Sequence, residues 1–506
     1  MTNYIKHPNP LYRGNPLIEA LGYPLTIDEL VKKSRIPYEG NLDLSETPPE
    51  YHGYYQRTAI DNLIRFHEPR DEIYRLYDIQ RRMIESGLVN RNPLITSKGN
   101  KNGIKLMALL NAIKNDLDES LSSSKGRSTK NNWIQSINVR KFGFHEVDHS
   151  FVFASLSGNG KTTMIENINK CEEMVIVHKE YVDHEGIKHK LPMKQIYKLY
   201  LKLDNRKGQK STLLSILESV DALIDTNYAE INANSDVRHL IAAVRKVAVI
   251  HGIGLIIFDE AQNLSTPAKT DTIGSNERVS MKFLEEIFNN IAVPTFFIGT
   301  FSMLSLFSRE GTIARRAGKD GSLLIASCEK DSPFWNRFCK ILFQTTFLGN
   351  QKTNFDDFKY HIHYLSAGLP AIAVSLTRAT LNFLTYLDPK NQDLSIVALD
   401  KIYKEQFEIL HGPLNALRSG KFGDYEDLSP MYKLERLENQ LKKGFEKLNK
   451  IDSFESLLEG QVTIKKDTQS PNKDPELSAK LAKLSEAMTP EAIIANSGSR
   501  SEEENK

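Results

Sequence analysis

The fold is decided by the stretch Ser150-Phe151-Val152-Phe153-Ala154-Ser155-Leu156-Ser157-Gly158-Asn159-Gly160-Lys161-Thr162. Its apolar residues, Phe151 to Ala154, predict a buried strand, and a helix is predicted to begin at Lys161. The turn between them fits the phosphate-loop pattern G-x-x-x-x-G-K-[ST], with Ser155 in place of the first glycine. Backbone N–H groups of such a loop surround phosphate oxygens, and the helix dipole favours their charge. The stretch therefore predicts a nucleotide-binding loop.

The loop also indicates which side chains meet the nucleotide. Lys161 is placed for the β- and γ-phosphates, and the Thr162 hydroxyl for Mg²⁺. ATP and Mg²⁺ are therefore the expected cofactors. The alternative is a glycine-rich turn that arises by chance, which the flanking strand and helix disfavour. The expected nucleotide-binding residues of the loop are Ser155, Ser157, Gly158, Asn159, Gly160, Lys161, Thr162 and Thr163.

A second apolar run, Leu255 to Phe258, ends in the acidic pair Asp259-Glu260. Ligands of parallel α/β sheets bind at the carboxyl ends of the strands, which is where this run delivers both carboxylates. Asp259 is the expected second Mg²⁺ ligand, and Glu260 is the expected general base that polarises the attacking water. The alternative, carboxylates that only cap a helix, is weakened by the phosphate loop upstream.

Four further residues are candidates for contact with the γ-phosphate. Thr300 follows the next apolar strand, Pro294 to Ile298, and is a candidate to position the water or to sense the γ-phosphate. The alternative, a cap for the helix predicted over Phe301 to Phe307, is compatible with that role. Arg315 and Arg316 follow, and an arginine that reaches a neighbour's site would stabilise charge on the transferring phosphate. The alternative is a solvated basic helix face. Arg378, after Gly368-Leu369-Pro370, is a candidate in cis or an ordinary surface charge.

Strand and helix patterns alternate from Ser150 onward, which is typical of a parallel sheet covered on both faces. We expect an α/β fold with a P-loop ATPase core. Further predictions are a strand over Ile196 to Leu203, helices over Leu213 to Ile224, Val237 to Val249 and Met281 to Ile291, and lid helices over Phe355 to Ser366, Leu369 to Leu384 and Ser395 to Leu410.

The chain divides by pattern into four parts. Residues 1–130 form a mostly helical N-terminal module, in which Thr58 to Gly87 carries apolar residues at helical spacing and Leu106 to Leu117 a further helix. Residues 131–350 form the ATPase core, and residues 351–430 the helical lid. Residues 431–506 hold an amphipathic helix, Met431 to Leu448, and a polar, partly disordered tail for partner binding.

Composition excludes several classes of protein. The 506 residues carry 66 Lys and Arg against 64 Asp and Glu, a net charge of +2, which argues against a globally basic nucleic-acid coat. A local basic strip, Arg206, Lys207 and Lys210, still suits sequence-independent contact with a phosphate backbone, the alternative being a solvated loop. No apolar run has the roughly 18 residues of a membrane span, and no secretory signal is evident. Three scattered cysteines fit the cytoplasm.

Together, the two nucleotide motifs, Thr300, the arginine pair and the helical lid resemble an AAA+ ATPase. Residues 12–21, Tyr-Arg-Gly-Asn-Pro-Leu-Ile-Glu-Ala-Leu, are similar to the N-terminal signature of the TnsC family, the AAA+ regulators of heteromeric bacterial transposons. Ser155 departs from the glycine usual in that family. Further motifs resemble those of the family and occur in the same order. They are Arg91-Asn92-Pro93, Asp259-Glu260 with Gln262 and Leu264, Ile298-Gly299-Thr300, Ala314-Arg315-Arg316 and Leu417-Arg418-Ser419-Gly420.

The resemblance implies an ATP-dependent regulator of DNA transposition in the bacterial cytoplasm. Such proteins oligomerise on duplex DNA as rings or filaments, through sequence-independent backbone contacts. They link a target-selection protein of the TnsD or TniQ type to transposase subunits of the TnsA and TnsB type. ATP hydrolysis then disassembles the complex.

Three other functions are weighed against this one. Another AAA+ DNA-remodelling ATPase, such as a replication initiator or helicase loader, would share the core but more often carry a helix-turn-helix after the lid. An ATP-binding scaffold without turnover is disfavoured by the intact Glu260 and Thr300. A small-molecule kinase is disfavoured by the lid and the arginine pair.

Overall fold

The fold is built on a five-stranded parallel sheet, in which the strands lie in the order β4-β5-β6-β1-β7. The computed structural model describes residues 2–94, 149–203, 208–264, 283, 291, 293–307, 311–343 and 348–420. The predicted α/β fold with a parallel sheet is confirmed. The strands are β1 (Ser150–Ser155), β4 (Lys198–Lys202), β5 (Leu255–Asp259), β6 (Thr295–Gly299) and β7 (Ser322–Ile325).

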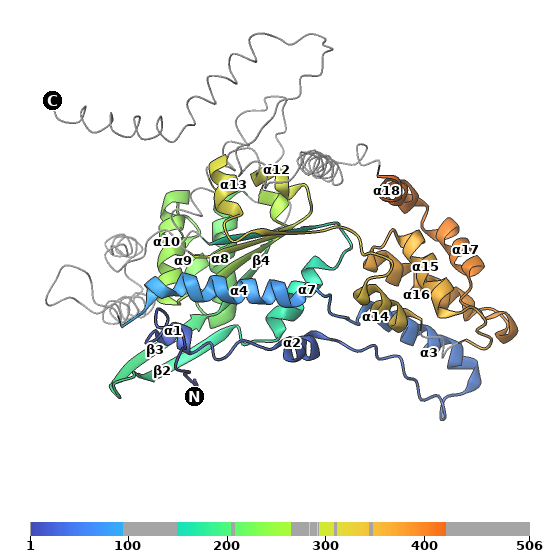
Figure 1. The fold of residues 1–506 in the computed structure, drawn as a ribbon, viewed down its shortest axis with the longest axis horizontal. Helices are drawn as coiled ribbons and strands as arrows, with labels where there is room; N and C mark the ends of the chain where they lie inside the picture. The colour runs from blue at the N-terminus through green and yellow to red at the C-terminus, as the bar shows by residue number, and fades with distance from the viewer. Residues whose placement is uncertain are drawn as a thin grey trace, which may run out of the picture. The chain divides into compact units, whose positions relative to one another are not determined.

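Helices cover both faces of this sheet because successive strand residues point to opposite sides. Phe151 and Phe153 of β1 belong to a core shared with α4 (Ile73–Leu88) and α7 (Lys161–Lys170). Val152 and Ala154 belong to the opposite core, which includes α8 (Gln209–Ile224) and α10 (Val237–Ile250). Figure 1 shows α4 and α7 on one side of the sheet and α8 and α10 on the other. All residues of β1, β5 and β6 are buried, as their apolar runs predict.

Over the part of the lid that the structure describes, residues 351–420, every element is a helix. The α-helices are α15 (Phe355–Ser366), α16 (Pro370–Leu384), α17 (Ile396–Gln406) and α18 (Glu408–Ser419), preceded by α14 (Pro333–Leu342). The predicted helix from Ser395 to Leu410 is wrong in its end, because the chain breaks at Phe407 and starts α18. From the N-terminal segment, α3 (Pro49–Asp61) packs on α16.

The N-terminal segment is bound to the core by the residues of its signature. Gly14 has φ +77°, a conformation that favours glycine, and the Asn15 side chain donates to the Leu88 carbonyl at the end of α4. The buried Glu19, which ends α1 (Pro16–Glu19), accepts from Gly14 N (2.9 Å) and Tyr181 Oη (2.7 Å). Helix α2 (Ile27–Ser34) then packs against α7.

The structure corrects two predicted elements. The strand expected over Ile196 to Leu203 is present as β4, but its start is wrong: Ile196 ends β3 (Lys188–Ile196), which pairs antiparallel with β2 (Val175–Val182) in a separate hairpin. The helical spacing over Thr58 to Gly87 is interrupted, because Pro69 and the backbone bridge from His67 to Ile36 separate α3 from α4. Shorter elements are η1 (Asn62–Ile64), η2 (Val89–Arg91), α9 (Tyr228–Asn232), η4 (Ala261–Leu264), α12 (Met303–Phe307), α13 (Gly311–Ala317) and η6 (Pro389–Asn391).

Some predicted segments lie outside the described residues. These are the helices over Leu106 to Leu117 and Met431 to Leu448, nearly all of Met281 to Ile291, and the C-terminal tail. Within the described ranges, no single helix is long and apolar enough to cross a membrane, although α15 and α16 pass that test as a pair bent by 118°.

Candidate nucleotide-binding site

The predicted phosphate loop connects β1 to α7 and is closed by its own side chains. Gly158 (φ +79°) and Gly160 (φ +81°) adopt the left-handed conformation that lets successive N–H groups turn inward. Asn159 Nδ2 donates to Ser155 Oγ at 2.7 Å, and both side chains are buried. Ser157 is exposed at the tip of the loop, and Thr163 is exposed on the first turn of α7. The loop is therefore formed as the sequence predicts.

Lys161 is held over the loop. Its Nζ donates to the Leu156 carbonyl at 3.1 Å, and 7% of the residue is exposed. Burial lowers the pKa of Lys161, while the nearby Glu260 and Asp259 carboxylates act against that shift. A buried cation that donates to a carbonyl can donate to a phosphate oxygen instead when nucleotide binds, because a phosphate oxygen is the stronger acceptor.

The predicted magnesium ligands lie next to each other. Thr162 Oγ1 donates to Asp259 Oδ2 at 2.8 Å, and Tyr200 Oη donates to the same oxygen at 2.6 Å. Asp259 is fully buried, and burial together with this hydrogen bond raises the pKa of Tyr200. Hard oxygen donors in this number fit Mg²⁺, which usually takes one or two protein ligands and completes its shell with phosphate and water. The described residues contain no cluster of three His, Cys, Asp or Glu side chains suited to a metal ion.

Glu260 and Thr300 are connected through a residue whose role sequence analysis missed. Gln262, on η4, donates from Nε2 to Glu260 Oε2 and accepts from Thr300 N at 3.2 Å through Oε1. Glu260 itself has φ +55°, a strained conformation of the kind that clusters at functional sites. The Thr300 hydroxyl contacts Ser302 Oγ at 2.6 Å. Because β6 lies between β1 and β5, Thr300 stands between the phosphate loop and Glu260.

A cavity of about 300 Å³ opens beside the phosphate loop, and no local sequence pattern predicted it. Its walls come from η1 and the loop after it, from α14, and from α16. Those walls are mainly apolar, with a few polar groups among them, which suits a flat heteroaromatic base next to bound phosphates. Apolar lining residues include Leu63, Phe66, Met164, Phe334, Phe338 and Val374, and polar ones include His67, Glu68 and Arg70.

The lid closes on the loop through α16. Ala371 N, in the first turn of α16, donates to the Gly158 carbonyl at 3.0 Å. Arg378 also lines the cavity, but it lies seven residues further along the helix, about 10 Å at 1.5 Å per residue. Its Nε is 3.7 Å from Asp61 Oδ1 of α3. In this arrangement Arg378 lies at the far end of the cavity from the phosphate loop, and its contact with the γ-phosphate stays a prediction.

The arginine pair lies away from the same chain's phosphate loop. Arg315 is exposed in the last turn of α13, and the Arg316 carbonyl accepts from Ser150 Oγ at the start of β1. The phosphate loop follows the other end of β1, about 16 Å away at 3.3 Å per residue. This placement is compatible with an arginine that acts on a neighbouring chain, and that role stays a prediction.

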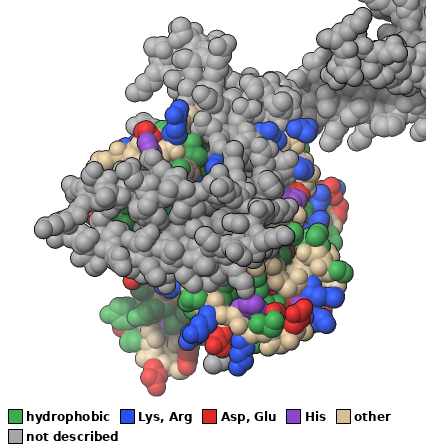
Figure 2. Space-filling view, turned by 90° about the vertical axis from the view of Figure 1, so that its left-hand side faces the viewer, with side chains coloured by type: hydrophobic (Ala, Val, Ile, Leu, Met, Phe, Trp, Pro, Cys, Tyr) green, Lys and Arg blue, Asp and Glu red, His purple; other side chains and the backbone are tan. Residues whose placement is uncertain are grey.

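Of the predicted basic strip, Arg206 and Lys207 lie outside the described residues. Lys210 is exposed in the first turn of α8, beyond the carboxyl end of β4. On the face drawn in Figure 2, the visible Lys and Arg side chains lie among Asp and Glu side chains, in keeping with the balanced composition. The role of the strip in DNA binding stays a prediction.

The comparisons with known proteins agree with the nucleotide site. Residues 149–307 match a family model described as an AAA domain, a range that contains the phosphate loop, Asp259, Glu260 and Thr300. With the sheet order, this match identifies an AAA-type P-loop ATPase fold. Among solved structures, one similar protein is the Walker-type ATPase PABY2304 of Pyrococcus abyssi. It is 12% identical, the similarity covers 54% of this chain and 71% of that chain, and the TM-score is 0.32. No curated protein matches the chain.

Proposed function

We propose that the chain is an ATP-hydrolysing molecular switch that oligomerises on duplex DNA and regulates transposition in the manner of the TnsC family. One observation carries the proposal: Thr162 meets Asp259, and Gln262 joins Glu260 to Thr300, which is the arrangement expected of an ATP-hydrolysis site. A scaffold that only binds ATP has no need for a positioned general base beside a metal site.

In this proposal each residue has a defined task. Backbone N–H groups of the loop and Lys161 bind the phosphates, while Thr162 and Asp259 hold the Mg²⁺ that neutralises phosphate charge. Glu260 accepts a proton from the attacking water, and Thr300 orients that water from the neighbouring strand. The cavity beside Phe66 and Phe338 takes the base.

The arginine pair connects hydrolysis to assembly. An arginine placed about 16 Å from its own loop contributes only if a second copy brings it to the site. Bound ATP then stabilises the contact between copies by mass action, and loss of the γ-phosphate weakens it. DNA bound through local cations such as Lys210 is released when the array comes apart.

The family-level part of the proposal rests on residues outside the ATPase core. The signature around Gly14 and Glu19 fixes the N-terminal segment to the end of α4 and to the β2–β3 hairpin. Arg418, of the motif at the end of the lid, donates to the Tyr364 carbonyl at 2.8 Å and lies over the ring of Tyr364. These motifs thus have defined packing roles, which supports the resemblance across most of the described chain.

Fluorescence anisotropy of a labelled DNA duplex tests the proposal. With Mg·ATP the full chain should bind the duplex at least tenfold more tightly than without nucleotide, and Lys161→Ala should lose that difference. Glu260→Gln should bind and stay bound, because it retains ATP. Equal binding with and without ATP would overturn the switch.

The transposition assignment needs its own assay. The Glu260→Gln variant, assembled on immobilised DNA with ATP, should retain purified transposase subunits of the TnsA and TnsB type. A target-selection protein of the TnsD or TniQ type should promote that assembly. Retention of a replicative helicase in place of transposase would identify a helicase loader.

A further inference from the structure

The serine that departs from the phosphate-loop pattern has a specific partner within the loop. Ser155 Oγ accepts a hydrogen bond of 2.7 Å from Asn159 Nδ2. Ser155 is 1% exposed and Asn159 2%, so neither side chain has water to replace the other. A glycine at position 155 would leave that amide hydrogen of Asn159 without this acceptor. Ser155 and Asn159 are therefore a matched pair that ties the two ends of the loop together.

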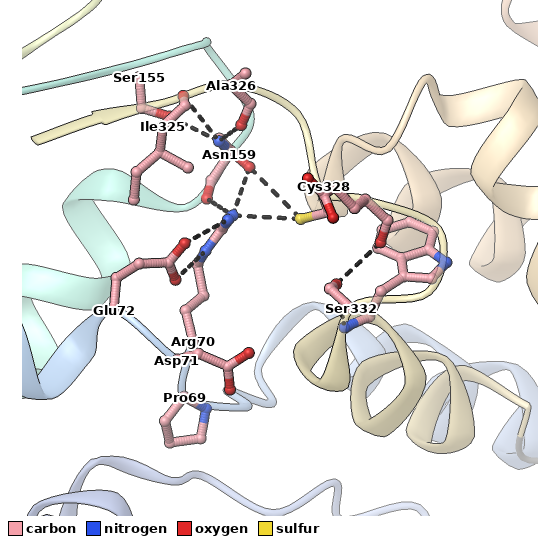
Figure 3. A network of polar contacts seen from close by, with 12 residues as sticks. Pro69, Arg70, Asp71, Glu72, Ser155, Asn159, Ile325, Ala326, Cys328 and Ser332 are labelled. Atoms are coloured by element: carbon pink, nitrogen blue, oxygen red, sulfur yellow. Dashed lines mark hydrogen bonds and ion pairs between the residues drawn. The ribbon is translucent and has the colours of Figure 1, made fainter. Parts of the chain in front are cut away.

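Asn159 also binds two segments outside the loop, as Figure 3 shows. Its Nδ2 donates to the carbonyl of Ala326, just after β7, at 2.5 Å. Its Oδ1 accepts from Arg70 Nη1 at 2.6 Å. The amide thus uses both donor and acceptor in a buried site, where each lost bond costs more than at the surface.

Arg70 is fixed in turn by the segment that lines the base cavity. Its Nε lies 3.3 Å from Glu72 Oε2, its Nη1 lies 3.3 Å from Cys328 Sγ, and its guanidinium lies 5.0 Å from the centre of the Phe334 ring. Burial raises the pKa of Cys328 to about 11, so the thiol is neutral beside the cation. Arg70 itself lines the cavity, two residues after Glu68.

We propose that Arg70, Asn159 and Ser155 form a positioning relay, which holds the phosphate loop in its binding geometry and links it to the wall of the base cavity. The inference rests on the proposed ATPase function and names positioning residues for it, since Ser155 and Asn159 act through side-chain contacts within the protein. A preformed loop binds the phosphates equally well before and during the reaction. The relay therefore governs ATP affinity and leaves the chemical step unchanged.

The test is a double-mutant cycle on Mg·ATP affinity, measured with a fluorescent ATP analogue, together with kcat. Asn159→Ala should weaken ATP binding about tenfold and leave kcat within about twofold. Ser155→Ala should weaken binding about threefold by itself. In the Asn159→Ala background it should have almost no further effect, because its partner is gone. The pair Arg70→Ala and Asn159→Ala should be non-additive in the same way.

Arg337→Ala is the matched control. Arg337 donates to Glu68 and Asp71 on either side of Arg70 in the chain, at 2.8 Å each, and these bonds do not reach the phosphate loop. It should leave ATP affinity within twofold. Thermal denaturation without nucleotide identifies any variant that fails to fold, and Ser155→Ala, which removes one oxygen atom, then carries the test.

The outcomes separate the inference from the proposed function. If wild type binds ATP, Lys161→Ala does not, and Asn159→Ala binds like wild type, the relay is wrong while the ATPase stands. Additive effects of Ser155→Ala and Asn159→Ala, or a fall in kcat at unchanged affinity, would also overturn the relay. If wild type and Lys161→Ala bind ATP equally, the proposed function fails first.

Discussion

Replacing Gln262 with alanine should slow ATP hydrolysis while leaving ATP affinity nearly unchanged. Gln262 holds the general-base candidate Glu260 through Nε2 and accepts from Thr300 N, so it fixes two groups that surround the attacking water. It does not belong to the phosphate loop or to the described lining of the base cavity. The substitution therefore removes orientation at the reacting end of the site only.

The contacts set the size of the effect. A hydrogen bond to a charged group contributes about 1.5–3 kcal/mol, and each 1.36 kcal/mol of activation free energy is tenfold in rate. If the lost bond reorients Glu260, kcat should fall roughly 10- to 100-fold. Gly299→Ala gives a second route to the same defect, because a Cβ there would lie 2.5 Å from Gln262 Oε1.

Phosphate release at saturating Mg·ATP measures kcat, and a fluorescent ATP analogue measures affinity. Asn263→Ala is the matched control, because its side chain, one residue along η4, donates to the Leu203 carbonyl instead. It should keep kcat within about twofold. An unchanged or increased kcat in Gln262→Ala would refute the reasoning, and an increase would mean that Gln262 restrains Glu260.

Three more predictions follow from the site. Burial lowers the pKa of His67 from 6.5 to about 4, so between pH 6.5 and pH 4 the unfolded chain binds more protons than the folded chain. The free energy of unfolding therefore falls by up to about 3 kcal/mol as the pH falls through this range. His67→Asn should flatten this pH dependence in thermal melts. Val374→Trp should fill the base cavity, weakening ATP binding at least tenfold without weakening binding of inorganic triphosphate, whereas equal losses would place the base elsewhere. A variant with Arg315→Ala and Arg316→Ala, inactive alone, should regain ATPase activity when mixed with Lys161→Ala subunits, and an inactive mixture would exclude arginine action between chains.

The elements that hold the catalytic candidates could be predicted because their signals are local. Apolar runs fix β1, β5 and β6 without ambiguity, and parallel strands bring their carboxyl ends to one edge. Asp259, at the end of β5, and Thr300, just after β6, therefore lie at that edge of the sheet. Lys161 and Thr162 follow from the loop pattern alone.

The missed features depend on contacts between distant segments. Arg70 and Asn159 are 89 residues apart, and the base cavity joins segments near residues 66, 338 and 374 that share no pattern. The β2–β3 hairpin was missed because β2 buries only two of its residues, so it lacks the strict alternation of a half-buried strand. Gln262 was noted only as part of the family resemblance, and its role was missed because it depends on the contact of η4 with Thr300.

The central claim is that ATP controls assembly on DNA, and electron microscopy of the full chain with duplex DNA tests it most directly. With a non-hydrolysable ATP analogue we expect rings or filaments around the DNA, and with ADP we expect dispersed protein. Lys161→Ala should stay dispersed in both. Single particles detached from DNA in the presence of the analogue, or identical assemblies with ADP, would contradict the account.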